Sequence, residues 1–230
     1  MINVENEANK ISLLNKKVAR GFERTANESI REYSERILKK LNLRVEIKEG
    51  DREVINSGDY DLVMANHPCS LDLLFLTFLF GNEKTAFVVQ NKRSLVLKKI
   101  FGSKFILPVP VSKETEQDFL RELNMLLKNN FRIVLFPTGG IEIKEAYPRI
   151  SFFSQRIFGS EILMRRKLLS LKIDPLVGVK IQKQIGNTLQ GIEILPEIHY
   201  TVSQKEISIP IKVNDIIVNN GEKEIFDNIL

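Results

Sequence analysis

The strongest constraint on the fold is an alternation of short strand-like runs with helix-like runs, which begins near residue 43. The strand-like runs cover residues 44–47, 62–65, 86–89, 105–109, 133–136, 176–181, 192–195 and 207–210. The helix-like runs cover residues 69–80, 94–101, 114–129, about 152–171 and 213–219. Strands that alternate with helices favour a sheet covered by helices on both faces. We therefore expect an α/β fold with a mixed, largely parallel sheet flanked by helices.

The first 44 residues have a helical pattern instead, with two apolar stripes at helical spacing. The stripes are Ile11, Leu14, Val18 and Phe22, and then Ile30, Tyr33, Ile37 and Leu41. Such stripes are typical of amphipathic helices. We expect an N-terminal helical segment at residues 1–44 and an α/β domain at residues 45–230. The stripes favour packing on the domain, and an interfacial membrane anchor is the alternative.

Composition limits the chemistry and the compartment. With 230 residues and 43% hydrophobic content, the chain can bury a full core. One cysteine excludes an internal disulfide framework, and two histidines with one cysteine leave no plausible zinc cluster, so we expect no metal. We find no signal peptide, and the longest apolar run, residues 71–80, is far shorter than the ~20 residues of a spanning helix. The expected location is the cytoplasm, with peripheral contact to a membrane.

Basic residues are concentrated in two parts of the chain. Residues 1–44 hold ten Lys or Arg and six Glu, and residues 92–104 hold five Lys or Arg without an acid. Such patches suit anionic partners, of which an anionic membrane surface is the one we expect, although a solvated basic face is an equal alternative. Phe22 and Tyr33 are too few aromatics for a stacking platform, so we expect no nucleic acid partner.

One candidate catalytic pair stands where a buried strand should open into a helix. His67 and Asp72 are five positions apart and directly follow the apolar run at residues 62–65. A neutral imidazole can take a proton from an alcohol when a carboxylate fixes its tautomer and stabilises the imidazolium. The alternative is structural: Asp72 as an acid stabilised by the helix macrodipole, and His67 as a turn residue.

Two further loops follow strand-like runs and are candidates for ligand binding. Lys113 ends the Pro-containing run at residues 107–113, and Thr138, Gly139 and Gly140 follow the strand-like run at residues 133–136. In open α/β sheets the ligand site lies outside the carboxyl ends of the strands, so these loops can meet the His67 loop in one cleft. An ordinary turn and a solvated lysine are the alternatives.

Taken together, these segments resemble the glycerolipid acyltransferases, the superfamily that contains 1-acyl-glycerol-3-phosphate acyltransferase. Asn66-His67-x-x-x-x-Asp72 is similar to the first motif of that family, Asn-His-x-Ser-x-x-Asp. Residues 107–113 resemble the second block, residues 136–140 the third block, Phe-Pro-Glu-Gly-Thr, and residues 174–179 the fourth. The resemblance covers roughly residues 45–200.

The resemblance implies a reaction and a role for each site residue. His67 would be the general base, oriented by Asp72, for transfer of a fatty acyl group to the hydroxyl of a lysolipid such as lysophosphatidate. The donor would be acyl-coenzyme A or acyl carrier protein, with neither cofactor nor metal. Lys113, Thr138, Gly139 and Gly140 would bind the polar head of the acceptor.

The chain departs from the family pattern at three positions. Cys69 stands in place of serine, Lys113 in place of arginine, and Thr138 in place of glutamate. The altered head-group residues keep other acceptors open, as in lyso-ornithine-lipid or hemolysin-like acyltransferases, and also a non-catalytic anionic-membrane-binding protein on the same fold. We expect Cys69 to be a helix-terminus residue rather than a nucleophile, and His199 to be structural.

Overall fold

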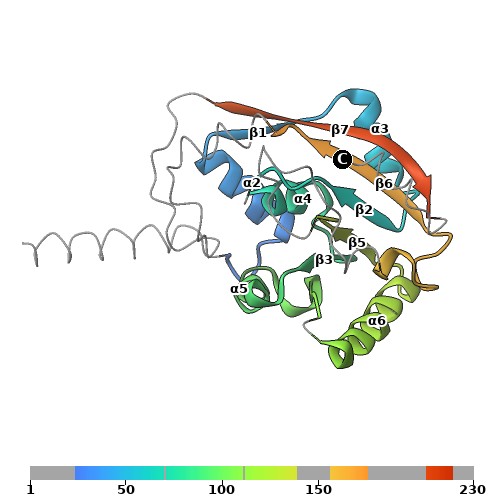
Figure 1. Ribbon diagram of the computed structural model, residues 1–230. Coiled ribbons are helices and arrows are strands. Elements are labelled where there is room, and N and C mark those ends of the chain that lie inside the picture. Colours follow the sequence, from blue (N-terminus) through green and yellow to red (C-terminus); the bar gives the residue numbers. More distant parts are fainter. Residues whose placement is uncertain (1–23, 70, 111, 139–155, 176–205, 220–230) are drawn as a thin grey trace, which may run out of the picture.

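The computed structural model describes residues 24–69, 71–110, 112–138, 156–175 and 206–219. Within these residues the chain forms one seven-stranded sheet with helices against it (Figure 1). The strands are β1 (Leu43–Glu46), β2 (Leu62–Ala65), β3 (Thr85–Val89), β4 (Ile106–Pro108), β5 (Arg132–Leu135), β6 (Lys167–Ile173) and β7 (Ile207–Val218). The predicted strands at residues 176–181 and 192–195 lie outside the described residues.

The sheet is mixed and largely parallel, as the alternation of elements predicts. Its strand order is β1-β7-β6-β2-β5-β3-β4. The five strands from β6 to β4 run parallel to one another. β7 pairs antiparallel with β6 and parallel with β1, so β7 and β1 run opposite to the other five strands. The carboxyl ends of β2, β5 and β4 therefore lie at the same edge of the sheet, which confirms the α/β fold class and fixes where a ligand site belongs.

The helices are α2 (Ile30–Lys40), α3 (Glu49–Ser57), α4 (Asp72–Phe80), α5 (Asn91–Phe101) and α6 (Lys113–Lys128), with a 3₁₀ turn η1 (Ser103–Phe105) before β4. Local signals explain where two of them begin. Ser29 and Glu32 form a capping box at the start of α2, and Ser112 accepts a hydrogen bond from the backbone of Thr115 at the start of α6. Each such cap stabilises a helix by about 1 kcal/mol.

Alternation along the strands sends side chains into two cores. Val63 and Ala65 of β2 pack in the larger core with residues of α2, α4 and α5, whereas Leu62 and Met64 pack in the smaller core with residues of α6. Both faces of β2 are thus buried, as expected for a central parallel strand.

Helix α2 confirms the second predicted apolar stripe. Ile30, Tyr33, Ile37 and Leu41 are all buried. The Ser34 hydroxyl lies 2.7 Å from that of Thr77 in α4, so α2 packs directly on the helix that follows His67. The first stripe, at residues 11–22, lies outside the described residues.

Two predicted helices are wrong over most of their described length. In the first, predicted at residues 152–171, only residues 156–158 form a helical turn, residues 167–171 belong to β6, and residues 152–155 lie outside the described residues. Residues 213–218 of the second belong to β7, which continues through Pro210. In β6, four consecutive residues are buried because both faces are covered. A buried run of this kind, Leu168 to Leu171, has no strict period of two and resembles a buried helix in sequence.

Helix α3 was missed altogether. It carries Glu49 and Asp51 in its first turn and ends at Gly58, which has a positive φ of 66°. Acidic residues at the start and a left-handed glycine after the end are the usual helix boundary signals. Its apolar content is too low for a clear stripe, because only Ile55 of this helix is buried.

Within the described part of the chain, none of the helices combines the length and the apolar content that crossing a bilayer requires.

Candidate active site

The candidate site begins where β2 ends. Asn66 and His67 directly follow this strand at the carboxyl edge of the sheet, and α4 starts five residues after His67. The side-chain amide of Asn66 donates to the carbonyl oxygen of Ile173 at 2.8 Å and accepts from its backbone N–H at 2.6 Å. This pair of bonds ties the end of β2 to the end of β6. Asn66 therefore fixes the backbone from which His67 projects.

The structure brings His67 and Asp72 together. The Nδ1 atom of His67 lies 2.9 Å from Oδ2 of Asp72. The Asp72 side chain is fully buried, whereas that of His67 is 19% exposed. With the carboxylate accepting at Nδ1, the neutral ring carries its proton there and its lone pair on Nε2. The pair thus has the geometry of a general base with its orienting carboxylate.

Cys69 completes the surroundings of Asp72. Its backbone N–H donates to Oδ2 of Asp72 at 2.8 Å, and its thiol donates to Oδ1 at 2.9 Å. Burial, followed by the negative charge of Asp72 and the hydrogen bond to it, raises the pKa of the Cys69 thiol well above its ordinary value of 9.0. A buried thiol that keeps its proton is a poor nucleophile, in agreement with its expected place at the helix terminus.

Phe136 covers one face of the imidazole. It follows β5, the neighbour of β2, and its ring stacks on that of His67 with centroids 4.3 Å apart and planes inclined by 19°. Phe136 is the first residue of the segment 136–140 that resembles the third acyltransferase block, and its contact with the base is not predicted by that resemblance. Only the parallel pairing of β2 with β5 brings the two residues together, and one sequence does not carry that information.

The other predicted site residues are only partly described. Thr138 is half-buried in the turn after β5, and Lys113 is the first residue of α6, just after β4. Both follow strands that end at the same edge as β2. Gly139, Gly140 and the side chain of Lys113 lie outside the described part of the structure. Binding of an acceptor by these residues stays a prediction.

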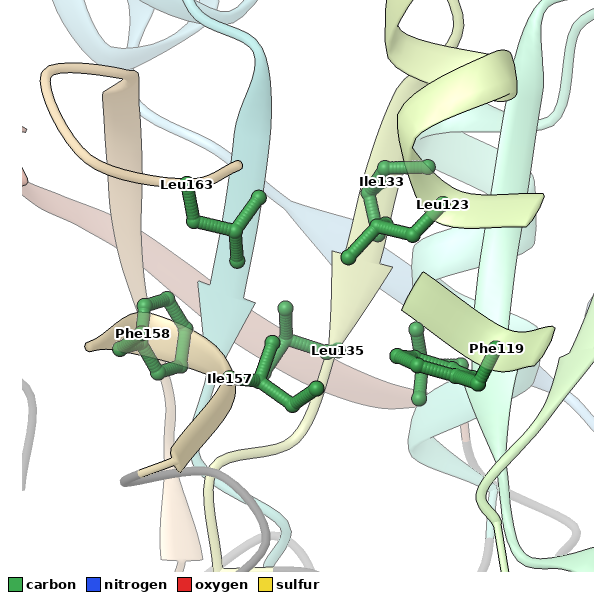
Figure 2. Close-up of a pocket in the computed structure, with 8 residues that line it drawn as sticks. Phe119, Leu123, Ile133, Leu135, Ile157, Phe158 and Leu163 are labelled. Carbon is green, nitrogen blue, oxygen red and sulfur yellow. The ribbon is translucent and has the colours of Figure 1, made fainter. Parts of the chain in front are cut away.

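An apolar hollow lies on the opposite face of the sheet from His67 (Figure 2). It is lined by Val88, Phe119, Leu123, Ile133, Leu135, Ile157, Phe158 and Leu163. The cavity between these side chains has a volume of about 10 Å³, roughly the space of one water molecule. Ile133 and Leu135 point into this hollow, whereas Phe136 packs with the core on the other side. The hollow and the His67 site are therefore separated by the sheet.

No group of three or more His, Cys, Asp or Glu side chains that could hold a metal ion occurs among the described residues.

Fold and site together define a mixed α/β protein that carries, at the carboxyl edge of its parallel strands, a histidine oriented by a buried carboxylate. No model of a known protein family matches the sequence, and no curated protein matches it. Among solved structures, the chain is similar to the 1-acyl-sn-glycerophosphate (LPA) acyltransferase PlsC from Thermotoga maritima. The two share 15% sequence identity with a TM-score of 0.46, over 86% of this chain and 76% of the other.

Proposed function

We propose that the protein is an acyltransferase that moves a fatty acyl group from an acyl thioester to the hydroxyl of a lysolipid. The observation that carries the proposal is the 2.9 Å contact between Nδ1 of His67 and Oδ2 of the buried Asp72. It orients a partly exposed imidazole at the sheet edge where a substrate can reach it. The proposal of acyl transfer as the reaction rests on the resemblance of residues 66–72 to the first acyltransferase motif.

The chemistry follows from the tautomer of His67. Nε2 takes the proton of the acceptor hydroxyl as its oxygen attacks the thioester carbonyl carbon. The tetrahedral intermediate then collapses, the C–S bond breaks, and the leaving thiolate takes the proton from the imidazolium. Asp72 stabilises the positive charge on the ring between these two steps. The products are an ester and a free thiol, and no covalent enzyme intermediate forms.

We assign the acceptor head group to Lys113, Thr138, Gly139 and Gly140, with lysophosphatidate as the first candidate. A lysine at position 113 offers a phosphate a point charge rather than the bidentate fork of an arginine. That substitution, with Thr138 in place of glutamate, keeps a lyso-ornithine lipid or the acceptor of a hemolysin-like acyltransferase as alternatives. The donor is acyl-coenzyme A or acyl carrier protein.

We further propose that the protein works in the cytoplasm, on an anionic membrane surface. Residues 84–113, here called the basic unit, contain β3, α5, η1 and β4 and end at the first residue of α6. They include seven Lys or Arg and no acid. On α5, Leu95 is 73% exposed, and Lys98 and Lys99 follow it at three and four positions. An apolar side chain flanked by lysines suits the boundary between headgroups and acyl chains. The same unit also supports the second candidate function, a membrane-binding protein without catalysis.

Thiol release from palmitoyl-coenzyme A tests the proposal. The acceptors are lysophosphatidate, glycerol-3-phosphate and lyso-ornithine lipid, and each is repeated with palmitoyl-acyl carrier protein as the donor. We expect acceptor-dependent release that His67→Ala lowers roughly a hundredfold to ten-thousandfold. His199→Gln changes the only other histidine and is the matched control, with activity retained.

Two outcomes would contradict the acyltransferase. One is full activity of His67→Ala, which would remove the base from the mechanism. The other is the absence of release with both donors and all three acceptors. Salt-sensitive binding to anionic vesicles in that second case would favour the non-catalytic membrane protein.

A further inference from the structure

Asp72 is a fully buried carboxylate whose hydrogen bonds come from very few residues. Its Oδ2 atom accepts from Nδ1 of His67 and from the backbone N–H of Cys69. Its Oδ1 atom accepts from the thiol of Cys69, which is the only donor to that oxygen among the described residues. Cys69 therefore binds both oxygens of the carboxylate on which His67 depends.

We propose that Cys69 is the positioning residue of the site, whose thiol holds Oδ1 of Asp72 and so turns Oδ2 toward His67. The inference rests on the proposed acyl transfer and adds a residue to it. Cys69 does not touch the substrate in this role. It acts through Asp72, and Asp72 acts through the imidazole.

Geometry explains why one residue can do this. Cys69 lies three positions before Asp72, at the turn that leads into α4, so the Asp72 side chain folds back over it. The backbone bond alone leaves the carboxylate free to rotate about its Cβ–Cγ bond. A second bond from the same residue to the other oxygen stops that rotation. With the carboxylate plane fixed, the imidazole keeps its proton on Nδ1 and its lone pair on Nε2.

The thiol suits this task because it stays protonated. Burial and the charge of Asp72 raise its pKa above the ordinary value of 9.0, so near neutral pH it is a permanent donor. The Sγ–Oδ1 distance of 2.9 Å lies in the range of hydrogen bonds between oxygen atoms. A serine hydroxyl therefore fits the same position, whereas an alanine leaves Oδ1 without its donor.

The experiment compares Cys69→Ser and Cys69→Ala with the wild-type protein. We expect Cys69→Ala to lower kcat about tenfold to a hundredfold, because a hydrogen bond to a buried charge is lost. KM should change little, and the rate–pH profile should change, since the carboxylate that orients the general base has lost one of its two bonds from Cys69. Cys69→Ser should restore most of the rate and the original profile.

Thr77→Val is the matched control. It removes a buried hydroxyl from the same helix, one that bonds to Ser34 and not to Asp72. It should lower Tm and leave both kcat and the pH profile unchanged. A loss of kcat in Thr77→Val as large as in Cys69→Ala would mean that the effect is one of packing, and would overturn the positioning role.

Proton NMR gives a readout that does not depend on turnover. The Nδ1–H proton of His67, bonded to a buried carboxylate, should resonate far downfield in the wild-type protein and in Cys69→Ser, and should be lost to exchange in Cys69→Ala. If the wild-type protein turns over and Cys69→Ala keeps the resonance, the rate and the profile, the inference is wrong while the acyltransferase stands. If the wild-type protein releases no thiol with either donor, the proposed function is overturned together with the catalytic role of Cys69. The resonance then still decides whether Cys69 orients the ring.

Discussion

The ring of Phe136 stacks on the imidazole of His67, with centroids 4.3 Å apart. His67 is thereby held at an edge by Asp72 and at a face by Phe136. The electron-rich face of an aromatic ring attracts a cation, so the stack is stronger when the imidazole carries a proton. Phe136 thus stabilises the state that the proposed mechanism passes through, and it joins the loop after β5 to the base.

Replacing Phe136 by leucine should slow the reaction without unfolding the protein. Aromatic stacking is worth about 0.5–1.5 kcal/mol, so we expect kcat to fall roughly twofold to tenfold. Phe136→Tyr keeps the ring and should keep the rate. Steady-state kinetics with both variants, alongside Tm, is the measurement. A Phe136→Leu variant with a wild-type rate and a lowered Tm would restrict Phe136 to a packing role.

Much of this edge of the fold is predictable from local sequence. The bounds of β2 agree with the predicted run at residues 62–65, and α4 and α6 begin within three residues of their predicted starts. The reason is that buried parallel strands and capped helices have strong local signals. The spacing of His67 and Asp72 across a strand-to-helix turn is equally local, so their contact could be predicted as well.

The remainder depends on contacts between distant segments. Asn66 bonds to Ile173, 107 positions away, and Phe136 meets His67 only because β5 pairs with β2. Residues 167–171 of β6 were predicted as helix because they show no strict alternation of apolar and polar side chains, and alternation is absent because both faces of the strand are buried. Burial on two faces is a property of the assembled sheet, and a single sequence does not state it.

Asp72→Asn should abolish most of the activity while leaving the backbone in place. The asparagine has the shape of the aspartate but loses its charge, and its amide group meets donors from His67 and Cys69. If the amide NH2 faces His67, the imidazole must carry its proton on Nε2, which is the wrong tautomer for a base. If it faces Cys69 instead, two donors face each other without an acceptor. We expect kcat to fall by at least about a hundredfold. Asp59→Asn, which removes an equal charge from an exposed pair with Lys167, is the control and should retain activity. Equal rates in the two variants would exclude orientation by Asp72.

Tyr33 offers a test of stability away from the site. Its side chain is fully buried and lies edge-on to Phe101, and its hydroxyl has no hydrogen-bond partner among the described residues. Tyr33→Phe should therefore stabilise the protein by about 1 kcal/mol. Tyr60→Phe is the matched control, because its hydroxyl donates to the Ile55 carbonyl, and it should destabilise by about 1 kcal/mol. Urea unfolding at pH 7 measures both. A clear loss of stability in Tyr33→Phe would show that the hydroxyl makes a stabilising hydrogen bond in the folded protein and would contradict this prediction.

The same tyrosine makes stability depend on alkaline pH. Burial raises the pKa of Tyr33 above its ordinary value of 10.0. The unfolded chain therefore releases the phenol proton at a lower pH than the folded protein does. The contribution of Tyr33 to stability is complete below pH 10 and is lost as the pH rises above it. Between pH 9 and pH 11, the Tm of Tyr33→Phe should therefore fall less than the Tm of the wild-type protein. Some fall should remain in the variant, because the pKa values of Cys69 and Tyr60 are also raised.

The basic unit at residues 84–113 should decide how tightly the protein binds anionic vesicles. Lys98 and Lys99 lie in the last turn of α5, which has no acid to offset them. Near an anionic surface each lysine is worth about 1 kcal/mol, so Lys98→Gln with Lys99→Gln should weaken binding about thirtyfold at physiological salt. Lys128→Gln with Lys172→Gln removes the same charge from α6 and β6 and should change binding far less. Co-sedimentation with phosphatidylserine vesicles measures the affinity. Added salt should weaken vesicle binding most for the wild-type protein, because screened charges contribute less. If both double variants lose affinity equally, binding follows net charge alone and α5 is not the membrane-facing surface.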